Sequence, residues 1–300
     1  MKKALITGSM GNIGKPLAEY LKDHDYDTME VDIKPSYRPN YICADITKPV
    51  DLLQAYDFHP DYVFHLAAMV SRVTCEQSAS MCIDANLVGT QNIIELTKRC
   101  GAKLINFSTS EVYGPDIEIM DEKVEPSPNN RYGLSKLLAE KLVAYEVQQH
   151  HLRAVTLRPF MMYDENEDMG DHRSVMIRFA HDLFVGKPVE VHSGSARGWL
   201  HVSDAVRAIE AATRVKEYAV INIGNPHIHS IDELANLICN EYHADPALIH
   251  YVELPERMTL VKRPALDRQK NLLGIETQVQ FEEGVKRVCQ KMRERMCQQV

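Results

Sequence analysis

The chain of 300 residues carries 34 lysines and arginines against 42 aspartates and glutamates, a formal net charge of -8 at pH 7. A composition that is 45% hydrophobic and 25% charged indicates a globular chain, long enough for one large domain or a domain with an added lobe. The acidic balance and the lack of a basic block argue against a nucleic-acid partner, and the lack of about 18 consecutive apolar residues argues against a membrane span.

The seven cysteines form no CxxC pair, and no histidine cluster has metal-ligand spacing. We therefore predict no metal site. An odd number of scattered cysteines is typical of reduced thiols, which predicts a cytoplasmic location.

The chain opens on a short apolar strand that leads into Gly8, Gly11 and Gly14 and then into an amphipathic helix. Gly8 allows a tight turn, Gly11 lets the backbone approach a pyrophosphate, and Gly14 permits close packing of helix on strand. A helix N-terminus there would present free N–H groups to phosphate. On spacing alone, an ordinary turn explains the glycines equally well.

Residues 27–32 form a candidate second strand that ends on Asp32, 18 residues past Gly14. At about this distance in a Rossmann unit, a carboxylate accepts both hydroxyls of the adenosine ribose. A carboxylate would also repel a 2′-phosphate, which favours NAD over NADP. The alternative is an aspartate that merely ends a strand.

Further strands are predicted over 41–44, 61–68 and 103–107, with one long helix over about 75–100. The hydroxyl-rich run Ser108 to Gly114 follows the last of these strands, at the sheet edge where α/β enzymes keep reacting groups. An ordinary Ser/Thr-rich turn is the alternative.

Tyr132 and Lys136 stand four residues apart at the start of the next predicted helix, so both lie on one face. An ammonium beside a phenol is expected to lower the phenol pKa from about 10, which would make Tyr132 an acid/base group near neutrality. Chance pairs of this kind are common, and the preceding glycines, Asp32 and hydroxyl loop are what favour catalysis.

The later chain continues the alternation without a linker or repeat, which predicts a smaller lobe closing over the sheet edge. Its predicted helices cover about 174–185, 204–215, 231–242 and 281–296, and its strands include 189–191 and 220–222. We predict an α/β fold with a Rossmann doubly wound parallel sheet over 1–160, further segments returning to it at about 198–225, and a mainly substrate-binding lobe over 161–300.

The chain resembles the extended short-chain dehydrogenase/reductase family, and within it the NAD-dependent epimerase/dehydratase group that acts on nucleotide sugars. The resemblance covers nearly the whole length. It is carried by TGSMGNIG at Thr7 to Gly14, HLAA at His65 to Ala68, STSEVYG at Ser108 to Gly114, YGLSK at Tyr132 to Lys136, RPF at Arg158 to Phe160 and GWLHVSDAV at Gly198 to Val206.

The resemblance implies an NAD site whose cofactor-binding residues are Gly8, Gly11, Asn12, Ile13, Gly14, Asp32, Ile33, Asp45, Ile46, Leu66, Ala67, Ala68, Tyr132, Lys136 and Pro159. Asp45 and Ile46 would flank the adenine, and Leu66, Ala67 and Ala68 would line the path to the nicotinamide. Tyr132 would take a proton from a sugar hydroxyl as hydride leaves the same carbon. Lys136 would lower the tyrosine pKa, and Thr109 would hydrogen-bond the reacting oxygen.

Ser110 and Glu111 complete the predicted catalytic set. In the resembling family, a carboxylate at the place of Glu111 is typical of sugar 4,6-dehydratases and of decarboxylases acting on a nucleotide-bound glucuronic acid. Once carbon 4 is a ketone, such a group could remove the acidic proton on carbon 5. A purely local salt bridge is the alternative, and the outcome among epimerisation, dehydration and decarboxylation stays open.

Arg197 and Arg263 match family positions that contact the substrate diphosphate or nucleotide, a bidentate task that suits arginine. The chain departs from the family after Phe160, where Met161 replaces an asparagine and an acidic run, 164–168, follows. Carboxylates near a diphosphate would repel it unless they point to solvent, so the loop is displaced or the substrate differs.

The resemblance also implies a homodimer formed through the helices starting near Cys75 and Tyr132. Two other functions stay open beside the leading one: a net sugar oxidoreductase, and a non-catalytic dinucleotide-binding sensor or partner protein. A sensor has no need of a tuned phenol, so the set of Thr109, Tyr132 and Lys136 argues against it.

Overall fold

The computed structural model describes residues 1–115, 117–170, 174–254 and 258–298. Its centre is a parallel sheet of seven strands in the order β11-β6-β5-β4-β1-β2-β3. These strands are β1 (Lys2–Thr7), β2 (Tyr26–Asp32), β3 (Tyr41–Cys43), β4 (Tyr62–His65), β5 (Lys103–Phe107), β6 (Ala154–Pro159) and β11 (Val220–Ile223). The strand order reverses between β1 and β4, and ligands bind α/β sheets at such a switch point. The predicted Rossmann sheet is confirmed.

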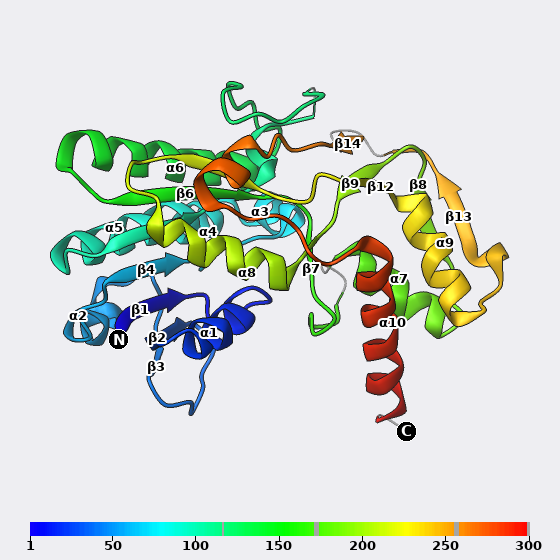
Figure 1. The fold of residues 1–300 in the computed structure, drawn as a ribbon, viewed down its shortest axis with the longest axis horizontal. Helices are drawn as coiled ribbons and strands as arrows, with labels where there is room; N and C mark the ends of the chain where they lie inside the picture. Colours follow the sequence, from blue (N-terminus) through cyan, green and yellow to red (C-terminus); the bar gives the residue numbers. More distant parts are fainter. Residues whose placement is uncertain (116, 171–173, 255–257, 299–300) are drawn as a thin grey trace.

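Alternation along the strands explains why helices cover both faces of the sheet. Ala4 and Ile6 of β1 face a core shared with α1 (Gly14–Asp23) and α8 (Val202–Ala211). Leu5, between them, faces the opposite core, which α5 (Gly89–Arg99) and α6 (Arg131–His150) help to close (Figure 1). The short α2 (Leu53–Asp57) joins this second face through Ala55.

The prediction of one continuous helix over about 75–100 is wrong. The structure has α3 (Arg72–Gln77), α4 (Ala79–Ile83), a π-helical turn (Asp84–Val88) and then α5. Ser78 breaks the helix with backbone angles of φ -129° and ψ 68°. Apolar spacing carries no sign of this break, because α3 and α4 both pack against α6.

The second lobe gathers beside the sheet (Figure 1). Its helices are α7 (Val175–Phe184), α9 (Ile231–Tyr242) and α10 (Phe281–Cys297), packed around the fully buried Trp199. Its strands are paired as β8 (Val189–His192) with β13 (Ile249–Val252), β7 (Met162–Tyr163) with β10 (Leu200–His201), and β9 (Ala196–Gly198) with β12 (Ile228–Ser230) and β14 (Val261–Lys262).

Segments of the later chain return to the first core. Val202, Val206 and Ile209 of α8, together with β11, belong to the same buried cluster as β1 and α1. Leu273 also packs there, from a π-helical turn over Gln269–Leu273. Remaining short turns of 3-10 helix lie at Pro49–Leu52, Ser110–Val112, Ala212–Arg214 and Pro246–Leu248.

Among the described residues, no helix combines the length and the apolar character that a membrane span requires.

Candidate active site

A cleft of about 860 Å³ opens at the switch point of the sheet. It is lined by most of the residues that the sequence singled out: Gly8, Gly11, Asn12, Ile13, Gly14, Asp32, Ile33, Asp45, Ile46, Leu66, Ala67, Ala68, Thr109, Ser110, Glu111, Tyr132 and Pro159. Lys136 lies buried one helical turn beyond Tyr132 and is 2% exposed. The structure thus brings the predicted cofactor residues and the predicted catalytic residues to one cleft.

The glycine-rich turn brings three backbone segments too close for side chains. Gly8 has φ +73°, and a Cβ there would lie 2.7 Å from the Ala67 nitrogen. A Cβ on Gly14 would lie 2.1 Å from the Gly8 carbonyl oxygen. Asp32 supports the turn, because its carboxylate accepts the Met10 N–H at 2.9 Å.

The backbone and polar groups of the cleft fit NAD. The N-terminus of α1 opens into it beside a cradle that any Cβ on the glycines would fill. The Ser108 hydroxyl, only 2% exposed, lines the same cleft and has no hydrogen-bond partner among the described residues. A buried polar group left this way is expected to meet a ligand or water.

Tyr132 enters the cleft from the first turn of α6. The helix begins here because Asn130 adopts an extended conformation and its side chain accepts the Gly133 N–H at 2.9 Å. Thr109, at the end of β5, hydrogen-bonds with the Tyr132 side chain and also accepts the Glu111 N–H at 3.2 Å. The hydroxyl, the phenol and the carboxylate therefore form one cluster.

The expected lowering of the Tyr132 pKa is wrong for this structure. Burial raises the phenol pKa, and the charge of Glu111 adds to the increase, while the hydrogen bond with Thr109 opposes it. Burial likewise lowers the pKa of Lys136 to about 8, against the attraction of Glu140. The i, i+4 spacing places the Lys136 ammonium on the same helix face as Tyr132. The ammonium does not offset the effect of burial on the phenol pKa.

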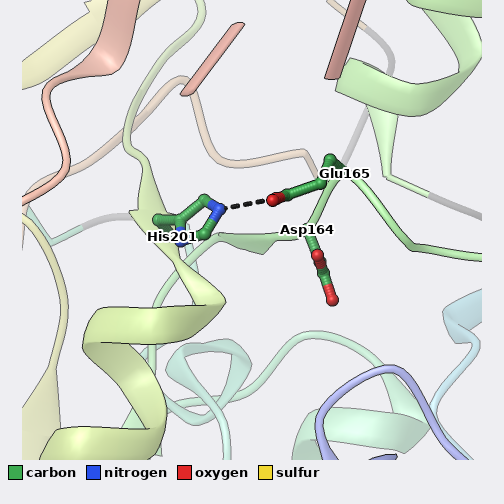
Figure 2. A group of neighbouring side chains, drawn as sticks. All are labelled: Asp164, Glu165 and His201. Carbon is green, nitrogen blue, oxygen red and sulfur yellow. Dashed lines mark hydrogen bonds and ion pairs between the residues drawn. The ribbon is translucent and has the colours of Figure 1, made fainter. Parts of the chain in front are cut away.

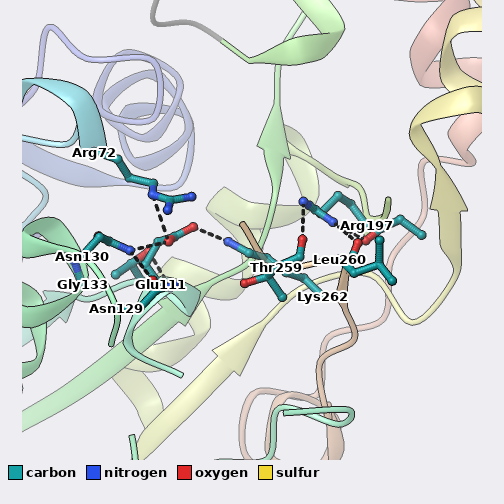
Figure 3. Close-up of polar contacts among 11 residues, drawn as sticks. Arg72, Glu111, Asn129, Asn130, Gly133, Arg197, Thr259, Leu260 and Lys262 are labelled. Atoms are coloured by element: carbon teal, nitrogen blue, oxygen red, sulfur yellow. Dashed lines mark hydrogen bonds and ion pairs between the residues drawn. The ribbon is translucent and has the colours of Figure 1, made fainter. Parts of the chain in front are cut away.

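Glu111 is held between two cations and an amide (Figure 3). It forms an ion pair with Lys262 of β14 and a second with Arg72 of α3, at 3.7 Å, and it accepts the Asn130 side-chain N–H at 2.9 Å. Burial alone would raise the carboxyl pKa, but these partners outweigh it and leave the pKa below its ordinary value. Glu111 is therefore ionised near neutrality.

Lys262 is a site residue that the sequence analysis did not predict, because it named the neighbouring Arg263 instead. It lines the cleft and is 7% exposed, whereas the predicted Arg263 is exposed and its backbone carbonyl accepts the Met120 N–H. Successive side chains of an extended segment point to opposite faces. A shift of one residue along the strand therefore replaces the cleft-facing cation with a solvent-facing one, and the structure does not bring Arg263 to the cleft.

Arg197 does not reach the cleft either. Its guanidinium is 5% exposed and donates to the backbone carbonyls of Leu260, at 2.7 Å, and Thr259, at 2.9 Å (Figure 3). Burial lowers its pKa to about 10. In this structure Arg197 ties β9 to the segment before β14, so it supports Lys262 rather than facing a ligand.

The acidic loop after Phe160 is paired with neighbouring segments, and its Asp164 and Glu167 line the cleft. Glu165 meets the His201 ring at 2.7 Å (Figure 2), which lowers the Glu165 pKa to about 2. Glu167 accepts the Ser174 hydroxyl at 2.6 Å. Asp164 is 7% exposed, accepts the Asn166 N–H at 3.0 Å, and has a pKa raised by burial. The prediction that this loop is displaced or serves another substrate stays open.

Asp164, Glu165 and His201 place ligand atoms within 4.8 Å of one another, as do His229, Glu233 and Glu282. The first group is accounted for by its own hydrogen bonds, because the Ser203 N–H donates to His201 Nδ1 and the opposite ring nitrogen then carries the proton toward Glu165. The absence of a metal site stays a prediction.

Asn86 is a second residue that the sequence reasoning left without a role. Its side chain accepts the Met69 N–H at 2.8 Å and donates to the Met69 carbonyl at 3.0 Å and to the Ser135 hydroxyl at 2.9 Å. It lies in the π-helical turn and ties the loop after β4 to α6 between Tyr132 and Lys136. The full burial of Asn86, which only the structure shows, marks this task.

Comparison with known proteins finds a family model and similar proteins that cover most of the chain. The model of the NAD dependent epimerase/dehydratase family matches residues 4–224. The UDP-N-acetyl-alpha-D-glucosaminuronate decarboxylase of Bacillus cytotoxicus is 29% identical over 98% of both chains. UDP-glucuronic acid decarboxylase 1 of Danio rerio is 29% identical over 96% of this chain and 72% of that protein.

Solved structures agree on the fold. MoeE5, solved in complex with UDP-glucose and NAD, superposes with a TM-score of 0.88 at 25% identity and covers 98% of this chain and 99% of that one. The UDP-glucose 4-epimerase of Thermotoga maritima reaches a TM-score of 0.91 at 23% identity, covering 98% and 99% of the two chains.

Proposed function

Because this chain belongs to the NAD-dependent epimerase/dehydratase family, we propose that it transiently oxidises carbon 4 of a nucleotide sugar and then epimerises, dehydrates or decarboxylates the product. One observation carries the proposal. Thr109 and Tyr132 meet at the end of β5, in the cleft that the glycine-rich turn opens, with Lys136 buried behind them.

The chain's own residues divide the work of proton transfer. Tyr132 exchanges a proton with the sugar hydroxyl, and Thr109 hydrogen-bonds the same oxygen to hold it in line. Lys136 supplies a positive charge that opposes the effect of burial on the phenol. NAD, when bound, supplies the hydride acceptor and a further positive charge in the cleft. Gly8, Gly11 and Gly14 would hold its pyrophosphate, and Asp32 its adenosine ribose.

A panel of nucleotide sugars, incubated with the enzyme and NAD and analysed by mass, tests the proposal. Unchanged mass indicates epimerisation, loss of water indicates dehydration, and loss of carbon dioxide indicates decarboxylation. Stoichiometric NADH release would instead identify a net oxidoreductase.

Tyr132→Phe should lower turnover by about 10²–10⁴-fold, because the proton acceptor is removed. Tyr145→Phe is the matched control, since Tyr145 lies on the same helix with its side chain 54% exposed. Equal rates for wild type and Tyr132→Phe on every reacting sugar would rule out the catalytic role.

Among the three outcomes, we favour the decarboxylation of a sugar acid. Lys262 lines the cleft beside Glu111 and offers a cation that a carboxylate on the sugar could contact. Loss of carbon dioxide would then be the product step. Both relatives described above are named as decarboxylases.

Lys262→Met tests this second point. If Lys262 faces a sugar carboxylate, the ratio of kcat/KM for a uronic-acid substrate over the neutral sugar should fall about tenfold or more, because a charge-assisted contact is lost. An unchanged kcat/KM ratio would show that Lys262 does not contact a sugar carboxylate.

The packing of the two cores supports a division into a cofactor part, 1–160 with the returning segment 198–225, and a mainly substrate-binding lobe over 161–300. α8 and β11 share the first core, whereas α7, α9 and α10 share the second. A cytoplasmic location is supported by the cysteines, all seven of which are free.

A homodimer is supported by an apolar strip on neighbouring helices, made of Val73, Met81, Leu134 and Leu138. Their side chains are between 39% and 62% exposed, and α3 and α4 both pack against α6. Exposed apolar side chains on helices that pack together are typical of an interface.

A further inference from the structure

A buried ion pair lies directly behind Lys136 and takes no part in the chemistry described so far. Arg158 of β6 donates from Nε to Glu140 Oε1 at 2.9 Å and from Nη2 to Oε2 at 2.7 Å. Both side chains are 5% exposed. Pairs of this kind add little net stability compared with apolar side chains of the same size, so stability alone does not explain the pair.

The register of α6 links this pair to the site. Tyr132, Lys136 and Glu140 follow one another at intervals of four residues, which places them on one stripe of the helix. Tyr132 opens into the cleft, Lys136 is buried one turn further on, and Glu140 one turn beyond that. The carboxylate thus stands at the closed end of the row.

Arg158 is fixed from other directions as well. Its guanidinium lies 4.8 Å from the centre of the Tyr113 ring, and the Tyr113 hydroxyl donates to Asn222 at 2.8 Å. Tyr113 stands two residues after Glu111. Glu140 is therefore held by an arginine that cannot easily move, which keeps its charge at a constant place beside Lys136.

Titratable groups that interact with the Lys136 charge include Glu140 from its own helix, Cys82 from α4 and His65 from β4. Burial lowers the pKa of His65 to about 3, so its ring is neutral at working pH. The thiol of Cys82 donates toward the Ser135 hydroxyl at 3.5 Å. Glu140 is the carboxylate of this set.

We propose that Glu140, held by Arg158, is a positioning residue that keeps Lys136 charged in its buried place and so sets the alkaline limit of the reaction. The proposal rests on the proposed function for the role of Lys136, but its effect on the Lys136 charge is measurable without any substrate.

The first test is an NMR titration of lysine side chains in the full chain, with the Lys136 signal assigned from Lys136→Arg. Glu140→Gln should move the Lys136 midpoint down from about 8, by about one unit, because the nearby negative charge is gone. Glu140→Asp keeps the charge and should restore a midpoint close to that of wild type. An unchanged midpoint in Glu140→Gln would overturn the proposal.

Glu146→Gln is the matched control. Glu146 lies further along the same helix, is 7% exposed and pairs with Lys98 at 2.7 Å. This variant should lose stability without moving the Lys136 midpoint. If Glu140→Gln fails to fold, Glu140→Gln/Arg158→Met removes both buried charges, and its midpoint should still fall below that of wild type.

The second test uses activity on any sugar that reacts. The alkaline limb of kcat/KM in Glu140→Gln should move to lower pH by the same amount as the NMR midpoint. A shifted midpoint with no reacting sugar would count against the proposed function alone. A reacting sugar with both the midpoint and the limb unmoved would count against Glu140 alone.

Discussion

Glu111 illustrates how a single residue stays ionised in a place that has lost most of its water. Burial disfavours the charge, but Lys262, Arg72 and Asn130 together hold the carboxyl pKa below its ordinary value of 4.5. Because its pKa is depressed, the ionised Glu111 carboxylate stabilises the fold, and this contribution is fully present above pH 4.5. The contribution is lost as the pH falls through the lower pKa of the folded protein.

Lys262→Met should therefore lower the free energy of unfolding by about 3 kcal/mol at pH 7, because Glu111 loses its main cation. The loss should shrink toward pH 4, where Glu111 of the variant takes up a proton more readily. Urea unfolding at both pH values measures it. Lys141→Met, which removes a surface pair with Glu125, should cost under about 1 kcal/mol at either pH. If Lys262→Met lowers the free energy of unfolding equally at both pH values, Lys262 does not stabilise the ionised Glu111.

Gly8 offers a test at the cofactor side of the cleft. Gly8→Ala should weaken NAD binding by about tenfold or more, since the new Cβ would force the turn away from Ala67. Gly101→Ala is matched in backbone strain, with φ +63° against +73°, but its Cβ meets nothing within 4 Å. Calorimetric titration with NAD should separate the two variants. Equal affinities would show that the close approach is irrelevant to the cofactor.

At the scale of elements, the start of α6 joins folding to function. Asn130 caps the helix through the Gly133 N–H and also donates to Glu111. The Asn130 side chain thus fixes both the start of α6, on which Tyr132 lies, and the orientation of the Glu111 carboxylate. A helix cap of this kind is readable from the sequence, but its second partner is not.

Asn130→Ala should cost about 1 kcal/mol in stability and also lower kcat, because both contacts are lost. Ser230→Ala removes the equivalent cap of α9, where the hydroxyl accepts the Glu233 N–H at 2.9 Å. It should cost a similar stability and leave kcat unchanged. Thermal unfolding and initial rates measure the two effects, and equal rates for both variants would separate Asn130 from the chemistry.

At the scale of the whole molecule, the strip on α3, α4 and α6 is the surface whose burial we expect in solution. Leu138→Asp should convert a dimer to a monomer, because a charge would be buried at the interface. Sedimentation velocity measures this, with Leu272→Asp as control, since Leu272 is 45% exposed against 39% for Leu138 but lies elsewhere. A wild-type chain that sediments as a monomer at micromolar concentration would contradict the dimer.

The sequence by itself determined the alternation of strands and helices, the glycine turn and the placing of Tyr132 and Lys136 on one helix face. These features are local, since two- and four-residue periods and special backbone conformations are written in neighbouring residues. The Rossmann sheet followed from that alternation, because parallel strands with crossover helices allow few topologies.

Only the tertiary structure decided which charges meet in the cleft. Lys262 pairs with Glu111 across 151 residues, while Arg197 is taken up by backbone carbonyls and Arg263 turns away. The direction of the Tyr132 pKa was likewise decided by burial, which no spacing reveals. Distant partners and loss of water depend on how loops from both halves of the chain pack together, and a local pattern holds no record of that packing.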